Sequence, residues 1–115
     1  MTPILAALLA LAGPAAAQDA PRGLAATYLC AGGAVLQVAY LNPEAGPSLA
    51  VANWAGKLIP MQAGPTGSGM RYIAFDEQAS YRWHAKGAEG TLLFLAADHT
   101  AREEVVLGGC REIGD

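Results

Sequence analysis

Hydrophobic residues recur at every second position in several stretches of this chain. Leu36, Val38 and Tyr40 alternate with smaller or more polar residues, and Tyr81 and Trp83 do the same further along. A period of two is typical of a β-strand that buries one face, because successive side chains point to opposite sides. The pattern therefore predicts strands rather than helices for these stretches.

Turn-forming residues separate the apolar runs. Two prolines and a glycine fall within residues 42–47, and glycine and proline dominate residues 62–69. Such clusters interrupt regular structure and mark loops. A helix competes with a strand only around residues 96–106. The predicted strands cover residues 24–30, 34–41, 49–54, 57–61, 70–75, 80–84, 91–97 and 103–110.

Seven or eight short strands with turns between them predict an all-β fold, an antiparallel sandwich or barrel. Closure into a barrel would leave no strand edge exposed. Residues 91–97 are apolar, which is compatible with a strand buried on both faces. Bulky residues are numerous enough to fill a small barrel and leave no ligand cavity: Leu36, Val38, Tyr40, Trp54, Tyr72, Trp83 and Phe94.

The first 17 residues have the pattern of a secretory signal peptide. An uncharged apolar run from Ile4 to Leu11 precedes three alanines that end at Ala17. This run is too short to span a bilayer, and the alanines suit a cleavage site. Pro14 stands where a lipid-bearing cysteine would be required, so we expect a mature periplasmic form without a membrane anchor. The expected organisation is a signal over 1–17, a short tail over 18–23 and one domain over 24–115.

Two cysteines, Cys30 and Cys110, lie near the two ends of the expected domain. In an exported chain such a pair is most simply a disulfide, which would close a loop of about 80 residues. Two cysteines and two histidines without zinc-ligand spacing do not predict a metal site. We therefore expect one disulfide, no metal and no cofactor.

The chain carries a formal net charge of −3 and has no cluster of lysine or arginine. This composition argues against nucleic-acid binding. An acidic domain is better suited to a basic protein partner, because opposite net charges speed encounter. The composition leaves the oligomeric state open between a monomer and a homodimer.

Candidate catalytic groups do not form a recognisable set. Ser68 lies between two glycines, but a nucleophile elbow needs glycine at the positions that Thr66 and Met70 occupy. The acidic pairs at residues 76–77 and 103–104 are neighbours in sequence, and neighbouring side chains tend to point apart rather than face each other across a glycosidase cleft. We therefore assign no catalytic residue and expect that the protein is not an enzyme.

Several segments together resemble the lysozyme-inhibitor family, the periplasmic and membrane-bound inhibitors of c-type lysozyme. Their order and spacing carry the resemblance, which extends from Tyr28 to Cys110. The segments are Tyr28-Leu29-Cys30, Val38-Ala39-Tyr40-Leu41-Asn42, Ser68-Gly69-Met70-Arg71-Tyr72 and the run from Tyr81 to Leu92. Departures from the family pattern fall at Met70, His84, Ala88 and Gly108.

The resemblance implies an eight-stranded antiparallel barrel that inserts a serine loop and a lysine loop into the active-site cleft of a c-type lysozyme. It assigns lysozyme binding to Ser68, Gly69, Arg71, Tyr72, Lys86 and Gly87. Inhibition would protect peptidoglycan from hydrolysis. The alternative is a small exported barrel that binds a cell-envelope or apolar ligand, with Ser68 and Lys86 as ordinary loop residues.

Overall fold

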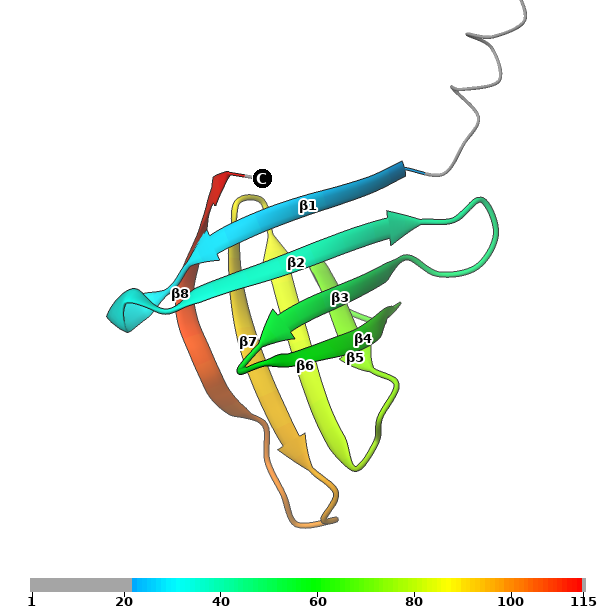
Figure 1. Cartoon of the computed structure of the whole chain (residues 1–115). Helices are drawn as coiled ribbons and strands as arrows, with labels where there is room; N and C mark the ends of the chain where they lie inside the picture. The colour runs from blue at the N-terminus through cyan, green and yellow to red at the C-terminus, as the bar shows by residue number, and fades with distance from the viewer. Residues whose placement is uncertain (1–21, 115) are drawn as a thin grey trace, which may run out of the picture.

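Eight antiparallel strands form one closed barrel in the computed structural model, which describes residues 22–114 (Figure 1). Each strand pairs with its neighbour in sequence, and β1 pairs with β8 to close the ring. The strands are β1 (Arg22–Leu29), β2 (Val35–Asn42), β3 (Leu49–Trp54), β4 (Lys57–Gly64), β5 (Met70–Ala74), β6 (Ala79–Lys86), β7 (Glu89–Ala96) and β8 (Glu104–Gly114), with a 3-10 turn η1 (Ala31–Gly33) between β1 and β2. The predicted all-β barrel is confirmed.

Several strands are longer than the sequence pattern predicts. β1 begins at Arg22, inside the expected tail, because Arg22 pairs with Asn42. β4 continues to Gly64, which pairs with Arg71, although residues 62–64 have loop composition. Around residues 96–106 the strands β7 and β8 and the loop between them replace the competing helix. A strand therefore continues as far as a neighbour offers backbone partners, whatever its side chains.

The expected signal peptide and residues 18–21 of the expected tail lie outside the described part of the chain. Within residues 22–114, no helix has the length and apolar character needed to cross a membrane.

Buried side chains from all eight strands occupy the barrel interior. Leu36, Met61, Trp83 and Leu92 are fully buried, which leaves little support for a barrel that encloses an apolar ligand. Tyr40 and Trp54 are partly buried against this core. On β7 only Gly90 and Leu92 are fully buried, so the apolar run there is not covered on both faces as its composition suggested.

Three aromatic residues form a hydrogen-bonded group inside the barrel. The Trp83 indole donates to the Tyr40 hydroxyl at 2.7 Å, and the Tyr28 and Tyr40 hydroxyls are also 2.7 Å apart. The Tyr28 and Trp83 rings pack edge to face at 4.9 Å. Burial raises the pKa of Tyr40 far above its usual value, so the hydroxyl stays neutral. The group links β1, β2 and β6 without an unsatisfied polar end.

Gly90 allows the Trp83 ring to approach the backbone of β7 closely. A Cβ at position 90 would fall 2.3 Å from the ring atom Cη2, which is closer than atoms can approach. Gly90→Ala should therefore displace the indole and lower the free energy of unfolding by about 1–3 kcal/mol, the usual cost of overpacking a core. Denaturant titration measures this change. Gly67→Ala is the matched control, since a Cβ there meets nothing within 4 Å; equal stability of the two variants would contradict the prediction.

The predicted disulfide is present between Cys30 and Cys110. Cys30 follows β1 directly, and Cys110 lies on β8 opposite Gly90 of β7. The bridge therefore fastens the first part of the barrel to its last strand, next to the position where β8 pairs with the hairpin formed by β6 and β7.

Candidate functional site

Two loops lie side by side at one end of the barrel. The serine loop, residues 65–69, connects β4 to β5, and the lysine loop, residues 86–89, is the tight turn between β6 and β7. Because β5 pairs with β6 through Met70 and Ala85, the loops extend beyond the same pair of neighbouring strands. Ser68 and Lys86 are both exposed there.

Glycines set the separation and shape of the two loops. A Cβ on Gly69 would lie 2.5 Å from the Ala85 carbonyl oxygen and 3.1 Å from the Lys86 Cβ, so the serine loop packs directly on the base of the lysine loop. Gly69 and Gly87 both have positive φ, at 69° and 60°. Gly87 is the first of the two central residues of the hairpin turn. A two-residue hairpin turn with positive φ at its first central position favours glycine there. Larger residues at either position would change the presentation of Ser68 or Lys86.

His84 connects the serine loop to β6. Its Nε2 lies 3.0 Å from the Ser68 carbonyl oxygen, and the Thr66 hydroxyl donates to the same oxygen at 2.9 Å. A carbonyl only accepts, so Nε2 carries the proton in this contact. The histidine bonds the main chain of Ser68, not its hydroxyl, so the contact does not form a nucleophile–base pair. Neither of these two contacts to the Ser68 carbonyl is predictable from the sequence pattern.

Removing the His84 side chain should loosen the serine loop and, if this loop contacts a lysozyme, weaken inhibition. Loss of one hydrogen bond of about 0.5–1.5 kcal/mol corresponds to a roughly 2- to 10-fold faster dissociation of the complex. His84→Gln, whose amide can donate to the same carbonyl, should restore most of the affinity. The matched control is His99→Ala, since the His99 side chain is 94% exposed. Equal dissociation rates for His84→Ala and the wild type would show that the contact does not position the loop.

The Lys86 ammonium has no ion-pair partner among residues 22–114. Glu89, at the other side of the same turn, is bound by Arg111 of β8 at 2.6 Å. Both of these side chains are largely exposed, so the pair contributes little stability. The ion pair instead affects Lys86. Arg111 binds the carboxylate that is nearest to Lys86 along the turn, which leaves the Lys86 ammonium available to an external anion.

Arg71 and Tyr72 lie beside the two loops but are arranged differently from Ser68 and Lys86. The Tyr72 side chain is 5% exposed and points into the barrel. Arg71 and Arg82 both bind the Glu103 carboxylate of the β7–β8 loop. Partial burial of Glu103 opposes ionisation, but the hydrogen bond from Arg82 and the charge of Arg71 outweigh it and lower the pKa of this carboxyl. Four of the six predicted binding residues therefore come together at the loops, while Tyr72 and Arg71 are engaged within the protein.

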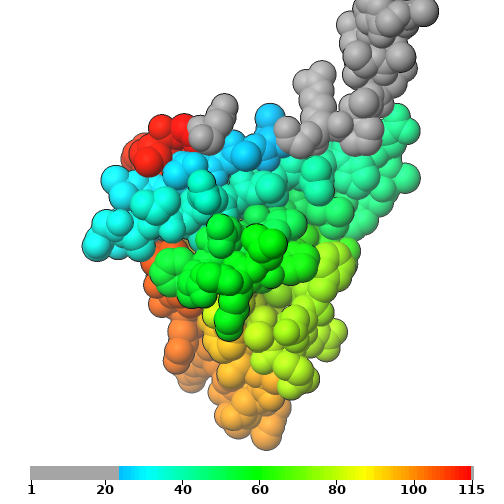
Figure 2. All heavy atoms as spheres, viewed as in Figure 1, coloured from blue at the N-terminus to red at the C-terminus, as the bar shows by residue number. Residues whose placement is uncertain are grey.

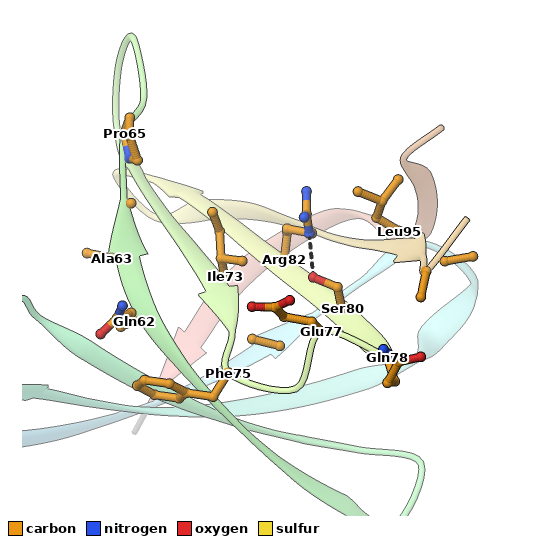
Figure 3. Close-up of a pocket in the computed structure, with 14 residues that line it drawn as sticks. Gln62, Ala63, Pro65, Ile73, Phe75, Glu77, Gln78, Ser80, Arg82 and Leu95 are labelled. Carbon is orange, nitrogen blue, oxygen red and sulfur yellow. Dashed lines mark hydrogen bonds between the residues drawn. The ribbon is translucent and has the colours of Figure 1, made fainter. Parts of the chain in front are cut away.

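Three hollows border this end of the barrel. The first, of about 310 Å³, lies beside the lysine loop and is lined by His84, Lys86, Glu89 and Arg111. A second, of about 350 Å³, lies at the barrel mouth between Gly69, Gly87, Tyr28 and Tyr72. A larger one of about 700 Å³, shown in Figure 3, extends over β4 to β7 and borders the serine loop only through Pro65. In the larger hollow Arg82 donates to the Ser80 hydroxyl at 3.0 Å. None of these hollows is predictable from local sequence patterns, because their linings come from several separate strands.

Comparison with known proteins identified a matching family and several solved structures of similar fold. A family model described as membrane-bound lysozyme-inhibitor of c-type lysozyme matches residues 28–101. The crystal structure of PliC-St, a periplasmic lysozyme inhibitor of C-type lysozyme from Salmonella typhimurium, superposes with a TM-score of 0.69 at 27% identity, covering 81% of this chain and 100% of that one. Adhesin Complex Protein from Neisseria meningitidis shares the fold, with a TM-score of 0.54 at 18% identity. The match covers 78% of this chain and 99% of that one. No curated protein sequence matches.

Proposed function

This chain belongs to the family of membrane-bound lysozyme inhibitors of c-type lysozyme, and from that premise we propose that it inhibits a c-type lysozyme by inserting Ser68 and Lys86 into the active-site cleft. The observation that supports this most directly is the packing of the two loops. Gly69 of the serine loop lies against Lys86, and both Ser68 and Lys86 are exposed. One cleft can therefore receive both side chains together.

The chemistry of the target suits these two side chains. Lysozyme cleaves a glycosidic bond with two carboxyl groups, one acting as acid and the other as nucleophile or stabiliser. The Lys86 ammonium and the Ser68 hydroxyl can donate charge-assisted hydrogen bonds to those groups and occupy the space of the sugar. The inhibitor itself performs no chemical step in this mechanism.

The barrel presents the loops in a preorganised form. The bond from His84 to Ser68 and the contact between Gly69 and Ala85 hold the loops on paired strands. The disulfide fastens β8, which pairs with the lysine hairpin. Loops that are already ordered lose little entropy on binding, so more of the interaction energy appears as affinity. A net charge of −3 also favours encounter with a basic lysozyme.

The proposed location of the mature protein is the periplasm, where it would protect peptidoglycan. The expected signal peptide over residues 1–17 supports this location. Fractionation of cells that express the full chain tests it, and accumulation in the cytoplasm would contradict it.

Lysis of a bacterial cell-wall suspension tests the function. The full chain is expressed, the resulting protein is purified, and a c-type lysozyme is titrated with it. Inhibition that nears completion at equimolar protein is the expected result. A saccharide that occupies the lysozyme cleft should compete with the inhibitor for binding. Absence of inhibition would refute the function for that lysozyme, whereas inhibition without competition would refute insertion into the cleft.

A further inference from the structure

The outer side chains of β1 to β4 form a surface without charge, which we call the β1–β4 face. Cross-strand register places Ala25, Ala39, Val51 and Pro60 side by side, and Thr27, Gln37, Asn53 and Leu58 in the next row. The remaining members are Leu29, Val35, Leu41 and Leu49. In Figure 2 the cyan and green strands of this half form one continuous side of the molecule.

Charge is concentrated on the other half of the barrel and its loops. The ion pairs of Glu103 with Arg71 and Arg82, and of Glu89 with Arg111, all belong to β5–β8 and the β7–β8 loop. On the β1–β4 face, Leu58 is 73% exposed and Val35 is 51% exposed. Monomeric proteins rarely expose a broad uncharged apolar surface, and such a surface marks an interaction site.

The shape of the face makes it complementary to itself. Leu58 projects at the border of a shallow hollow of about 250 Å³ lined by Ala25, Ala39, Val51 and Asn53. A two-fold contact brings the same patch of both copies together, so a projection on one copy must meet a depression of the same patch on the other. Leu58 and this hollow supply both parts.

The size of the face suits a small, reversible contact. Four strands spaced about 4.8 Å apart, with about six residues each at roughly 3.3 Å, cover about 19 by 20 Å. Two copies together therefore contribute about 760 Å² in projection, and side-chain relief adds to this accessible area. The contact falls near or below the limit of about 1,200 Å² for stable interfaces, so we expect a weak dimer that dissociates on dilution.

Two charged residues at opposite ends of the face indicate an orientation. Glu44 lies in the loop between β2 and β3, and Lys57 begins β4 at the other end of β3. Both are exposed, and within residues 22–114 neither has an ion-pair partner. We place a two-fold axis in the plane of the interface, at right angles to the strands. The strands of the second copy then run in the opposite direction to those of the first. Glu44 of each copy then approaches Lys57 of the other.

We propose that a second copy of this chain covers the β1–β4 face, forming a symmetric dimer in which each Leu58 packs into the hollow of the other copy. Ser68 and Lys86 lie outside this face, so both inhibitory sites stay accessible. The dimer is therefore independent of the proposed lysozyme mechanism. Its assembly can be tested without any lysozyme.

Sedimentation velocity of the purified full-chain product over the micromolar range tests the dimer. The wild type should dimerise. Leu58→Asp should raise the dissociation constant at least about a hundredfold, because it buries an unpaired carboxylate. Val35→Lys provides a second disruption at an exposed position, and Val105→Asp, at a 63% exposed position on β8 outside the face, should remain dimeric. Unchanged melting curves, read at a concentration where the wild type is monomeric, would show that the variants fold.

A charge exchange tests the orientation. Glu44→Lys should weaken the dimer, and adding Lys57→Glu to it should restore the affinity. A monomeric wild type at every concentration would overturn the proposal, as would a dimer that Val105→Asp dissociates and Leu58→Asp does not. Flotation of a monomeric wild type with phospholipid vesicles, lost in Leu58→Asp, would also overturn it and assign the face to a lipid surface.

Discussion

Lys86→Ala should weaken inhibition of a c-type lysozyme by roughly 30-fold to several thousand-fold, because loss of one partner from a buried charge pair costs about 2–5 kcal/mol. Much of this cost comes from the lysozyme carboxylate that would remain desolvated without a cation. Lys86→Glu should abolish inhibition, since it places like charges together. Ser68→Ala should have a smaller effect of about 1.5–3 kcal/mol, as expected for a hydrogen bond to a charged group.

The inhibition constant in the cell-wall assay measures these effects. Lys57→Ala is the matched control, because Lys57 is the other lysine of the chain and lies at the opposite end of β4 from the serine loop. It should inhibit as the wild type does. Full inhibition by the Ser68→Ala, Lys86→Ala double variant would refute the insertion mechanism. Because Lys86 is exposed and forms no ion pair within residues 22–114, its substitution should leave the melting temperature unchanged, which separates this result from misfolding.

Loss of the Cys30–Cys110 disulfide should cost up to about 4–5 kcal/mol of unfolding free energy, the value for a closed loop of about 80 residues in the chain-entropy treatment. A small domain has a total stability of about 5–15 kcal/mol, so a large part of it depends on this bond. Replacement of both cysteines with serine, followed by denaturant titration, measures the change. Residual structure in the unfolded chain would reduce it.

The same variant should also weaken inhibition, because Cys110 pairs with Gly90 beneath the lysine hairpin. The comparison uses oxidised and reduced wild type beside the double serine variant. Reduced wild type should resemble the variant in stability. Equal stability of the oxidised and reduced forms would show that the bond does not stabilise the barrel.

The strand pattern was predictable where alternation was strong. Leu36, Val38 and Trp83 lie inside the barrel as their period of two indicated. Strand lengths were less predictable, as Gly64 shows, because pairing with Arg71 on β5 extends β4 through residues of loop composition. Ser80 is only 6% exposed although it alternates with Tyr81 and Trp83, since it lies in an outer hollow where Arg82 bonds it.

The candidate site was predictable in part. Ser68 and Lys86 were identified from the segments that resemble the inhibitor family, and the structure brings their loops into contact. The same resemblance assigned lysozyme binding to Tyr72, but alternation along β5 turns its ring into the barrel. The contact of His84 with Ser68 was not predictable, because it depends on how closely the serine loop packs on β6.

The sequence by itself determined the all-β class, most strand positions, the pairing of Cys30 with Cys110 and the family resemblance. These properties depend on local alternation, on turn residues and on a count of two cysteines, all of which are present in the order of the residues. Only the tertiary structure decided that the serine and lysine loops touch, that Glu89 is held by Arg111, and that uncharged side chains of β1 to β4 form one face. Such relations depend on strand register and barrel closure, which bring residues together over long sequence distances, and local patterns contain no information about those distances.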